Sequence, residues 1–99
     1  MRFITHNDDE INVTRTVLVG QVKCYYHKLV EILGEPANQD GMPNWDIQFD
    51  DGTVATLYGW NVHFKDRDVN RVWNVGGKSA ATLWKVYDLV NQENNFVNL

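Results

Sequence analysis

The sequence predicts an α+β fold, with a small antiparallel sheet of about four strands and two helices packed on one face. Three observations predict it. The chain has 99 residues, which suffices for one domain spanning residues 1–99 and one core. Segments with strand and helix periodicity follow in the order strand, helix, strand, strand, strand, helix. Two of the strand-like segments are separated only by "DDG", which predicts an antiparallel hairpin.

The composition limits the classes of partner and compartment. With 43% hydrophobic and 12% aromatic residues, the chain has the composition of a folded globular protein. The net charge of −4 argues against nucleic acid as a partner, because phosphate binding needs clustered Lys and Arg. Cys24 is the only cysteine, so no internal disulfide can form and the cytoplasm is the expected compartment. We expect neither a secretory signal nor a membrane span, and no membrane partner.

The first third of the chain predicts a loop, a strand and a helix. Residues 1–11 carry the acidic cluster "NDDE" and are expected in a solvated loop or a mobile end. Residues 12–19 alternate β-branched and other side chains, which predicts a strand closed by Gly20. Residues 21–33 change to helical spacing, and the helix is expected to end at Gly34. Its apolar side is formed by Val22, Tyr25 or Tyr26, Leu29, Val30 and Leu33.

Catalytic residues are not predicted. Cys24 and His27 lie three residues apart on the expected helix, and they could form a nucleophilic pair or simply be a buried cysteine and a surface histidine. The second interpretation is favoured, because no third residue can be placed to orient the histidine. Asp46 and His63 are the other candidates for acid-base chemistry, but no motif links them. We therefore expect a protein without enzymatic activity.

Residues 45–60, "WDIQFDDGTVATLYGW", predict the hairpin, and its register depends on the turn. Trp45, Ile47 and Phe49 share one side of the first strand. A two-residue turn at Asp51-Gly52 would place beside them Val54, Thr56 and Tyr58. A three-residue loop, with Gly52 in the left-handed position of a G1 bulge, would instead place there Ala55 and Leu57. The three-residue loop is favoured, because it makes one face wholly apolar and leaves that face for the helices to cover.

The opposite face of the hairpin then carries rings and short polar groups: Asn44, Asp46, Gln48, Thr56, Tyr58 and Trp60. Asp46 would lie opposite Thr56, and Asn44 opposite Tyr58. Such a face can stack a planar ligand or bind a protein, and it can equally be a solvated face stabilised by its two aromatic residues. Both interpretations stay open. Because Tyr58, Trp60 and Trp73 would be costly to leave in water, self-association is expected.

The last third predicts a charged connection, a strand and a helix. His63, Asp66 and Asp68 lie in the connection at spacings that match no named metal site, so no metal or other cofactor is predicted. Residues 71–75 follow as a strand, and Ser79 is a natural N-cap for the last helix. The apolar stripe of that helix is expected to comprise Leu83, Tyr87 and Val90, flanked by Trp84 and Val86.

The segment "GGKS", residues 76–79, is compared with a phosphate-binding P-loop. The comparison fails, because that motif requires a glycine five positions before Gly77, where Val72 stands. A weaker anion site remains, formed by free backbone N–H groups of Gly76 and Gly77 with Lys78 and Ser79 at a helix start. The alternative is a strand-to-helix turn with a good cap.

Three segments, "LVEILGEP", "WDIQFDDGTVATLYGW" and "WNVGGKSAAT", together resemble a group of small proteins encoded mostly by bacteriophages. The shared pattern is a helix that ends in Gly-Glu-Pro, a W-x-[IVL]-x-F-x-D-G-T-x-A-T hairpin and a W-x-[IV]-G-G-x-S turn. The resemblance covers residues 15–90 and implies no particular activity. It implies a context, that of a phage accessory protein that counteracts a bacterial defence in the host cytoplasm.

Two functions follow as expectations. In the first, the protein binds and sequesters a small nucleotide-type signal without catalysis. The ligand-binding residues would then be Asp46, Thr56, Tyr58, Trp60, Trp73, Gly76, Gly77, Lys78 and Ser79. In the alternative, the aromatic sheet face or the acidic N-terminal segment occludes a host defence protein.

Overall fold

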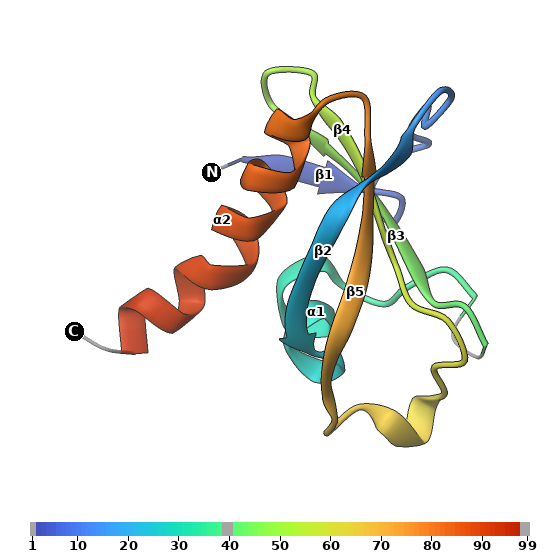
Figure 1. Ribbon diagram of the computed structural model, residues 1–99, viewed down its shortest axis with the longest axis vertical. Coiled ribbons are helices and arrows are strands. Elements are labelled where there is room, and N and C mark those ends of the chain that lie inside the picture. The colour runs from blue at the N-terminus through green and yellow to red at the C-terminus, as the bar shows by residue number, and fades with distance from the viewer. Residues whose placement is uncertain (1, 39–40, 98–99) are drawn as a thin grey trace.

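The computed structural model describes residues 2–38 and 41–97, and it shows the predicted α+β fold (Figure 1). The described chain forms a five-stranded sheet of order β1-β3-β4-β5-β2, in which every neighbouring pair is antiparallel. The strands and helices are β1 (Phe3–Thr5), β2 (Val17–Tyr25), α1 (Tyr26–Leu33), β3 (Asn44–Phe49), β4 (Val54–Tyr58), β5 (Asn70–Gly77) and α2 (Ala80–Val97). The sheet has one strand more than the expected four because β1, in the segment expected to be a loop, pairs with β3.

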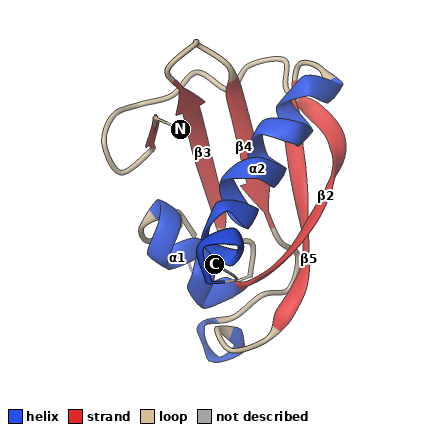
Figure 2. Cartoon of the chain, turned by 90° about the vertical axis from the view of Figure 1, so that its left-hand side faces the viewer, coloured by secondary structure: helices blue, strands red, loops and turns tan. Residues whose placement is uncertain are grey.

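Both helices cover the same face of the sheet. Figure 2 shows α2 crossing in front of the strands, with α1 beside its C-terminal half on the same side. Side chains from this face and from the two helices form a single buried cluster. In the sheet, its largest members include the predicted residues Trp45, Ile47, Phe49 and Leu57. The opposite face of the sheet, called the open face below, has no helix packed on it among the described residues.

The hairpin between β3 and β4 has the predicted register. Trp45 pairs with Leu57, and Ile47 pairs with Ala55, so the apolar side chains of both strands lie on the helix-covered face. The Gly52 N–H group donates to the Phe49 carbonyl at 2.9 Å, and Gly52 has a φ of +89°. A left-handed backbone favours glycine because other residues would strain there. The three-residue loop with Gly52 in the left-handed position is therefore confirmed.

The predicted boundary between the first strand and the first helix is wrong. The strand β2 begins later than expected, runs through Gly20 and continues to Tyr25, and α1 forms only at Tyr26. Val22 and Cys24 are buried, whereas the residues beside them are exposed, which is the alternation of a strand. A helix and a strand both place apolar residues at positions 22 and 26, so the spacing alone did not separate them. The segment up to Tyr25 is a strand because it pairs with β5.

The end of α1 is as predicted. Gly34 follows the last turn with a φ of +84°, and its N–H group donates to the Val30 carbonyl at 2.8 Å. Asn7 caps the same end from the N-terminal segment, because its Nδ2 atom donates to the carbonyls of Leu33 and Glu35. The acidic residues that follow Asn7 are exposed, as expected for solvated charge.

Two predictions about the last strand and helix are also wrong. Gly76 and Gly77 do not form a turn: they are the last two residues of β5 and pair with Leu18 and Val17 of β2. Tyr87 does not lie in the buried stripe of α2, where it was expected beside Val90, but is exposed. The buried side of α2 is instead formed by Thr82, Val86, Leu89 and Val90. The described helices include none that is long and apolar enough to cross a membrane.

Three aromatic rings form the centre of the core. Tyr26, Trp45 and Trp73 contact one another edge to face, with ring centroids 5.4 to 5.9 Å apart. Each indole also has a polar partner in the backbone around α1. The Nε1 atom of Trp45 donates to the Gly34 carbonyl at 2.8 Å, and that of Trp73 donates to the Cys24 carbonyl at 2.9 Å. The two tryptophans thus fix both ends of α1 on the sheet.

Candidate functional site

The open face is organised as rows of side chains that cross the strands. The antiparallel register aligns one row over four strands, Asn44, Tyr58, Asn74 and Gln21. The next row is aligned in the same way and comprises Asp46, Thr56, Gly76 and Leu18. Amides, hydroxyls and one carboxylate therefore lie side by side on a surface that neither α1 nor α2 covers. Such groups form directional hydrogen bonds with a bound partner.

Two aromatic rings lie at one end of this surface. Tyr58 ends β4 on the open face, and its ring contacts that of Trp60 edge to face with centroids 6.3 Å apart. The Trp60 side chain is 59% exposed, whereas Trp45 and Phe49 of the hairpin lie in the core. The backbone of Trp60 is fixed by Arg71, whose Nη2 atom donates to the Trp60 carbonyl at 3.2 Å. The exposed indole is thus held on an anchored backbone.

Asp46 is the charged residue in the middle of the face. Partial burial raises the pKa of its carboxyl, while the nearby charge of His6 and a hydrogen bond from Asn44 lower it. His6 is placed there by β1, because its N–H group donates to the Asp46 carbonyl at 3.1 Å. The carboxylate is therefore partly desolvated before any partner binds, and a hydrogen-bond donor from a partner would be favoured beside it.

Gly76 lets Thr56 occupy the centre of the face. These two residues pair across β4 and β5, and a Cβ atom at position 76 would collide with the Thr56 hydroxyl. Glycine at this position thus allows close approach rather than a special backbone angle. Gly76 was predicted to offer a free N–H group at the start of a helix, but it is instead a paired residue of the sheet.

The structure separates the nine predicted ligand residues into three places. Asp46, Thr56, Tyr58 and Trp60 lie together with Gly76 on and beside the open face. Trp73 does not belong to that surface, because it is fully buried on the helix-covered face and cannot stack a ligand. The remaining three lie at the junction of β5 and α2. These are Gly77, buried against Thr82, and the exposed Lys78 and Ser79.

The structure removes Gly76 and Gly77 from the predicted anion site. Backbone N–H groups can hold an anion when the chain leaves regular structure, but Gly76 and Gly77 are paired within the sheet. Ser79 does occupy the position before α2, and the Thr82 N–H group donates to its backbone carbonyl at 3.1 Å. The interpretation as a strand-to-helix connection fits this geometry better than the anion site.

Two residues of the open face were missed from the sequence. The Gln21 amide donates to the Asn74 amide oxygen at 3.0 Å, which completes the row that begins at Asn44 and Tyr58. Asn74 was missed because its neighbour Trp73 is among the predicted ligand residues, and neighbouring residues of a strand point to opposite faces. Gln21 was missed because the spacing of its segment predicts a helix.

Cys24 and His27 do not form a pair on one helix, because Cys24 belongs to β2 and His27 to α1. Burial raises the pKa of the Cys24 thiol to about 11. At neutral pH the thiol is protonated, and a protonated, buried thiol is a poor nucleophile. This agrees with the interpretation of Cys24 as a small core residue.

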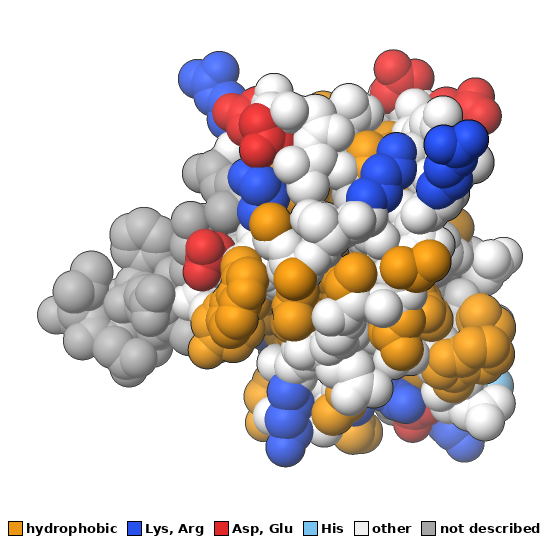
Figure 3. Space-filling view, turned by 45° about the horizontal axis from the view of Figure 1, so that its top comes forward, with side chains coloured by type: hydrophobic (Ala, Val, Ile, Leu, Met, Phe, Trp, Pro, Cys, Tyr) orange, Lys and Arg blue, Asp and Glu red, His pale blue; other side chains and the backbone are white. Residues whose placement is uncertain are grey.

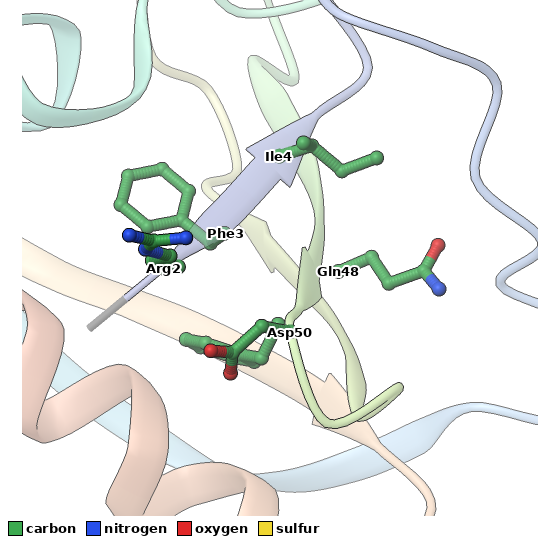
Figure 4. A pocket seen from close by; sticks show the side chains of 6 residues that line it. Arg2, Phe3, Ile4, Gln48 and Asp50 are labelled. Carbon is green, nitrogen blue, oxygen red and sulfur yellow. The ribbon is translucent and has the colours of Figure 1, made fainter.

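A hollow of about 560 Å³ lies at the end of the β1–β3 pair, away from the predicted ligand residues (Figure 4). Figure 4 shows Ile4 and Gln48 on one side of the paired strands and Arg2, Phe3 and Asp50 on the other, so the lining side chains diverge. They leave an open groove around the strand ends and no chamber that could enclose a small molecule.

Comparison of the chain with protein-family models, with curated proteins and with solved structures found no match. The assignment of a function therefore depends on the geometry of the open face.

Proposed function

We propose that this protein is a non-catalytic binding module, which uses the open face to occlude a protein partner. The observation that carries the proposal is the exposed Trp60 indole, held beside Tyr58 at the end of a row of amide and hydroxyl groups. Tryptophan and tyrosine dominate the binding energy of protein interfaces, and surrounding polar groups supply specificity. The resemblance to phage accessory proteins suggests that the partner is a defence protein of the host.

The shape of the face favours a protein over a small molecule. Small-molecule sites are concave and cover most of the ligand surface. The open face is one side of a sheet, and the ring that was expected to complete a stacking site, Trp73, is in the core. A protein surface can cover a broad sheet face and bury an anchor such as Trp60 in a pocket of its own.

The row of Asn44, Tyr58, Asn74 and Gln21, called the polar row below, and the neighbouring Asp46 determine which groups a partner must present. Asn44, Asn74 and Gln21 offer both donors and acceptors, whereas Asp46 offers only acceptors while it is ionised. Since the whole chain has a net charge of −4, a neutral or basic surface is the better complement. We expect a partner surface with hydrogen-bond donors opposite Asp46 and an apolar pocket opposite Trp60.

Capture from a lysate of the host bacterium tests the proposal. The full chain should retain a protein that Trp60→Ala and Tyr58→Ala lose, with an affinity loss of about tenfold or more for Trp60→Ala, the range of an interface hot spot. Lys78→Ala is the matched control, because Lys78 is exposed but lies at the start of α2. Far-ultraviolet circular dichroism establishes that each variant is folded. Equal capture by all variants would exclude the open face as the binding surface.

Capture of a nucleotide-type signal is the second candidate, and one observation supports it. Asp46, Thr56 and Tyr58 are gathered on one face with Trp60 beside them, as that function requires. Mass spectrometry of protein purified from signal-producing cells tests it. A retained nucleotide that is lost in Tyr58→Ala but kept in Trp73→Phe would favour this candidate over the protein partner. If the purified protein retains no nucleotide, the protein-binding proposal is the one of the two that remains.

A further inference from the structure

The strand β2 forms one edge of the sheet, and it is long for an edge strand. It has nine residues and, among the described strands, pairs only with β5, whereas β1 at the opposite edge has three residues. Figure 2 shows β2 at the right-hand edge of the sheet, which is the side that faces the viewer in Figure 1. The outer side of an edge strand presents unpaired backbone donors and acceptors, and the group that fits them is another strand.

The helix α2 adds apolar surface beside this edge. On one flank of α2, Lys85 forms an ion pair with Asp51 in the β3–β4 loop at 2.8 Å. On the other flank, Leu83 lies over Gly20 of β2. Tyr87 extends the Leu83 flank outward, because residues four apart on a helix differ by about 40° in direction, and the Trp84 ring lies against that of Tyr87. Trp84 and Tyr87 therefore lie on the side of α2 nearer to the free edge.

These two rings are exposed although they are large and apolar. Trp84 is 62% exposed and contacts Tyr87 edge to face, with ring centroids 6.1 Å apart. In β2 itself, Val17 and Leu18 are also mostly exposed. Figure 3, a tilted view of the side seen in Figure 1, shows hydrophobic side chains in a band across the molecule. An apolar surface that is continuous with an unpaired strand edge marks an interface.

The charges along the edge allow self-pairing. The chain carries 13 acidic residues, but none lies between residues 11 and 30, and Lys23 is the only charged residue of β2. An antiparallel pairing about a two-fold axis at Gln21 sets Lys23 opposite Val19 of the second copy, where β2 has its bulge. The two Lys23 residues are then four strand positions apart, about 13 Å, which exceeds the screening length of about 8 Å at physiological ionic strength.

We propose that the protein forms a homodimer in which β2 pairs antiparallel with β2 of a second copy. The pairing joins the two sheets into one, and Trp84 and Tyr87 pack beside the two-fold axis on the helix side. A second copy fits better than an unrelated strand, because it supplies the same pair of exposed rings, Trp84 and Tyr87, along with the strand. Lys23 and the bulge between Leu18 and Gly20 are features that restrict edge pairing. In the proposed dimer, these two features restrict the pairing to the register in which Lys23 lies opposite Val19 of the second copy.

Sedimentation equilibrium of the full chain from micromolar to millimolar concentration tests the proposal. The wild type should show the mass of a dimer. Trp84→Glu and Leu18→Glu should each raise the dissociation constant at least about tenfold, because each places a charge in the apolar part of the interface. Ile4→Glu is the matched control at the opposite edge of the sheet, and Trp60→Glu is the matched tryptophan control. Both controls should remain dimeric.

Hydrogen exchange of the wild-type protein gives a readout that needs no variant. Amides of β2 should exchange more slowly at high protein concentration than at low concentration, while amides of β1 should not change. A monomer across the whole concentration range would overturn the proposal. A dimer that Trp84→Glu and Leu18→Glu leave intact, with β2 exchange independent of concentration, would place the interface elsewhere and also overturn it. The proposed function uses the open face, so loss of partner capture in Trp60→Ala with an unchanged dimer separates the two proposals.

Discussion

The clearest contrast in this protein is between Trp73 and Trp60, one fully buried and the other largely exposed. We expect Trp73→Phe to lower the free energy of unfolding by about 2–4 kcal/mol. Removal of the indole Nε1 leaves the Cys24 carbonyl without its 2.9 Å donor, which costs about 1–3 kcal/mol, and the smaller ring leaves a gap beside Tyr26 and Trp45 that adds about 1 kcal/mol. For a chain of this size, the midpoint of thermal unfolding should fall by about 10 °C or more.

Urea unfolding followed by circular dichroism measures this loss. Trp60→Phe is the matched control, because the same exchange at an exposed position should change the free energy of unfolding by no more than about 0.5 kcal/mol. Partner capture at low temperature should show the opposite pattern, being weakened by Trp60→Phe and retained by Trp73→Phe. A free energy of unfolding for Trp73→Phe within about 0.5 kcal/mol of the wild type would refute the placement of Trp73 in the core.

Two further predictions concern the hairpin loop. Gly52→Ala should lower the free energy of unfolding, measured in urea, by about 1–2 kcal/mol, because the φ of +89° at this position strains residues other than glycine. Gly52→Asn should lower it less, since asparagine tolerates a left-handed backbone. Equal stability of the wild type and both variants would contradict the bulged loop. The hydrogen bond from Lys85 holds the pKa of the Asp51 carboxyl well below its usual range, so the pair stabilises the fold at neutral pH and loses this effect as the pH falls below about 4. Lys85→Met should therefore have a lower free energy of unfolding than the wild type at pH 7, and this difference should shrink toward pH 2. If the difference in free energy does not depend on pH, the ion pair contributes nothing to stability.

The hairpin could be predicted because two independent signals agree there. Strict alternation fixed the inward side of β3, and a wholly apolar face was possible only with Gly52 in a bulged loop. The end of α1 was predictable for a similar reason, since Gly34 and Pro36 both stop a helix. Local chemistry determines both features, and local chemistry can be read from a sequence.

The start of α1 and the role of the two glycines after Val75 could not be predicted, because both depend on pairing between distant segments. The strand β2 extends to Tyr25 because β5, some fifty residues later, supplies hydrogen bonds along its length. The same pairing holds Gly76 and Gly77 in the sheet, where the sequence alone indicated a turn. The candidate site was affected in the same way, since Trp73 could be placed inside only once the face of β5 was known.

The two proposals meet at Gln21. The polar row on the open face runs from Asn44 and Tyr58 through Asn74 to Gln21, and Gln21 lies on the edge strand. Pairing about a two-fold axis at Gln21 would continue this row into the same row of the second copy, in reverse order. The Trp60 anchors would then lie at opposite ends of a single surface, and a partner with two equivalent sites could bind both copies with an affinity well above that of one. Trp84→Glu, on the helix side of the sheet, should therefore weaken capture of such a partner while leaving the binding of a single site unchanged, whereas Trp60→Ala should abolish both.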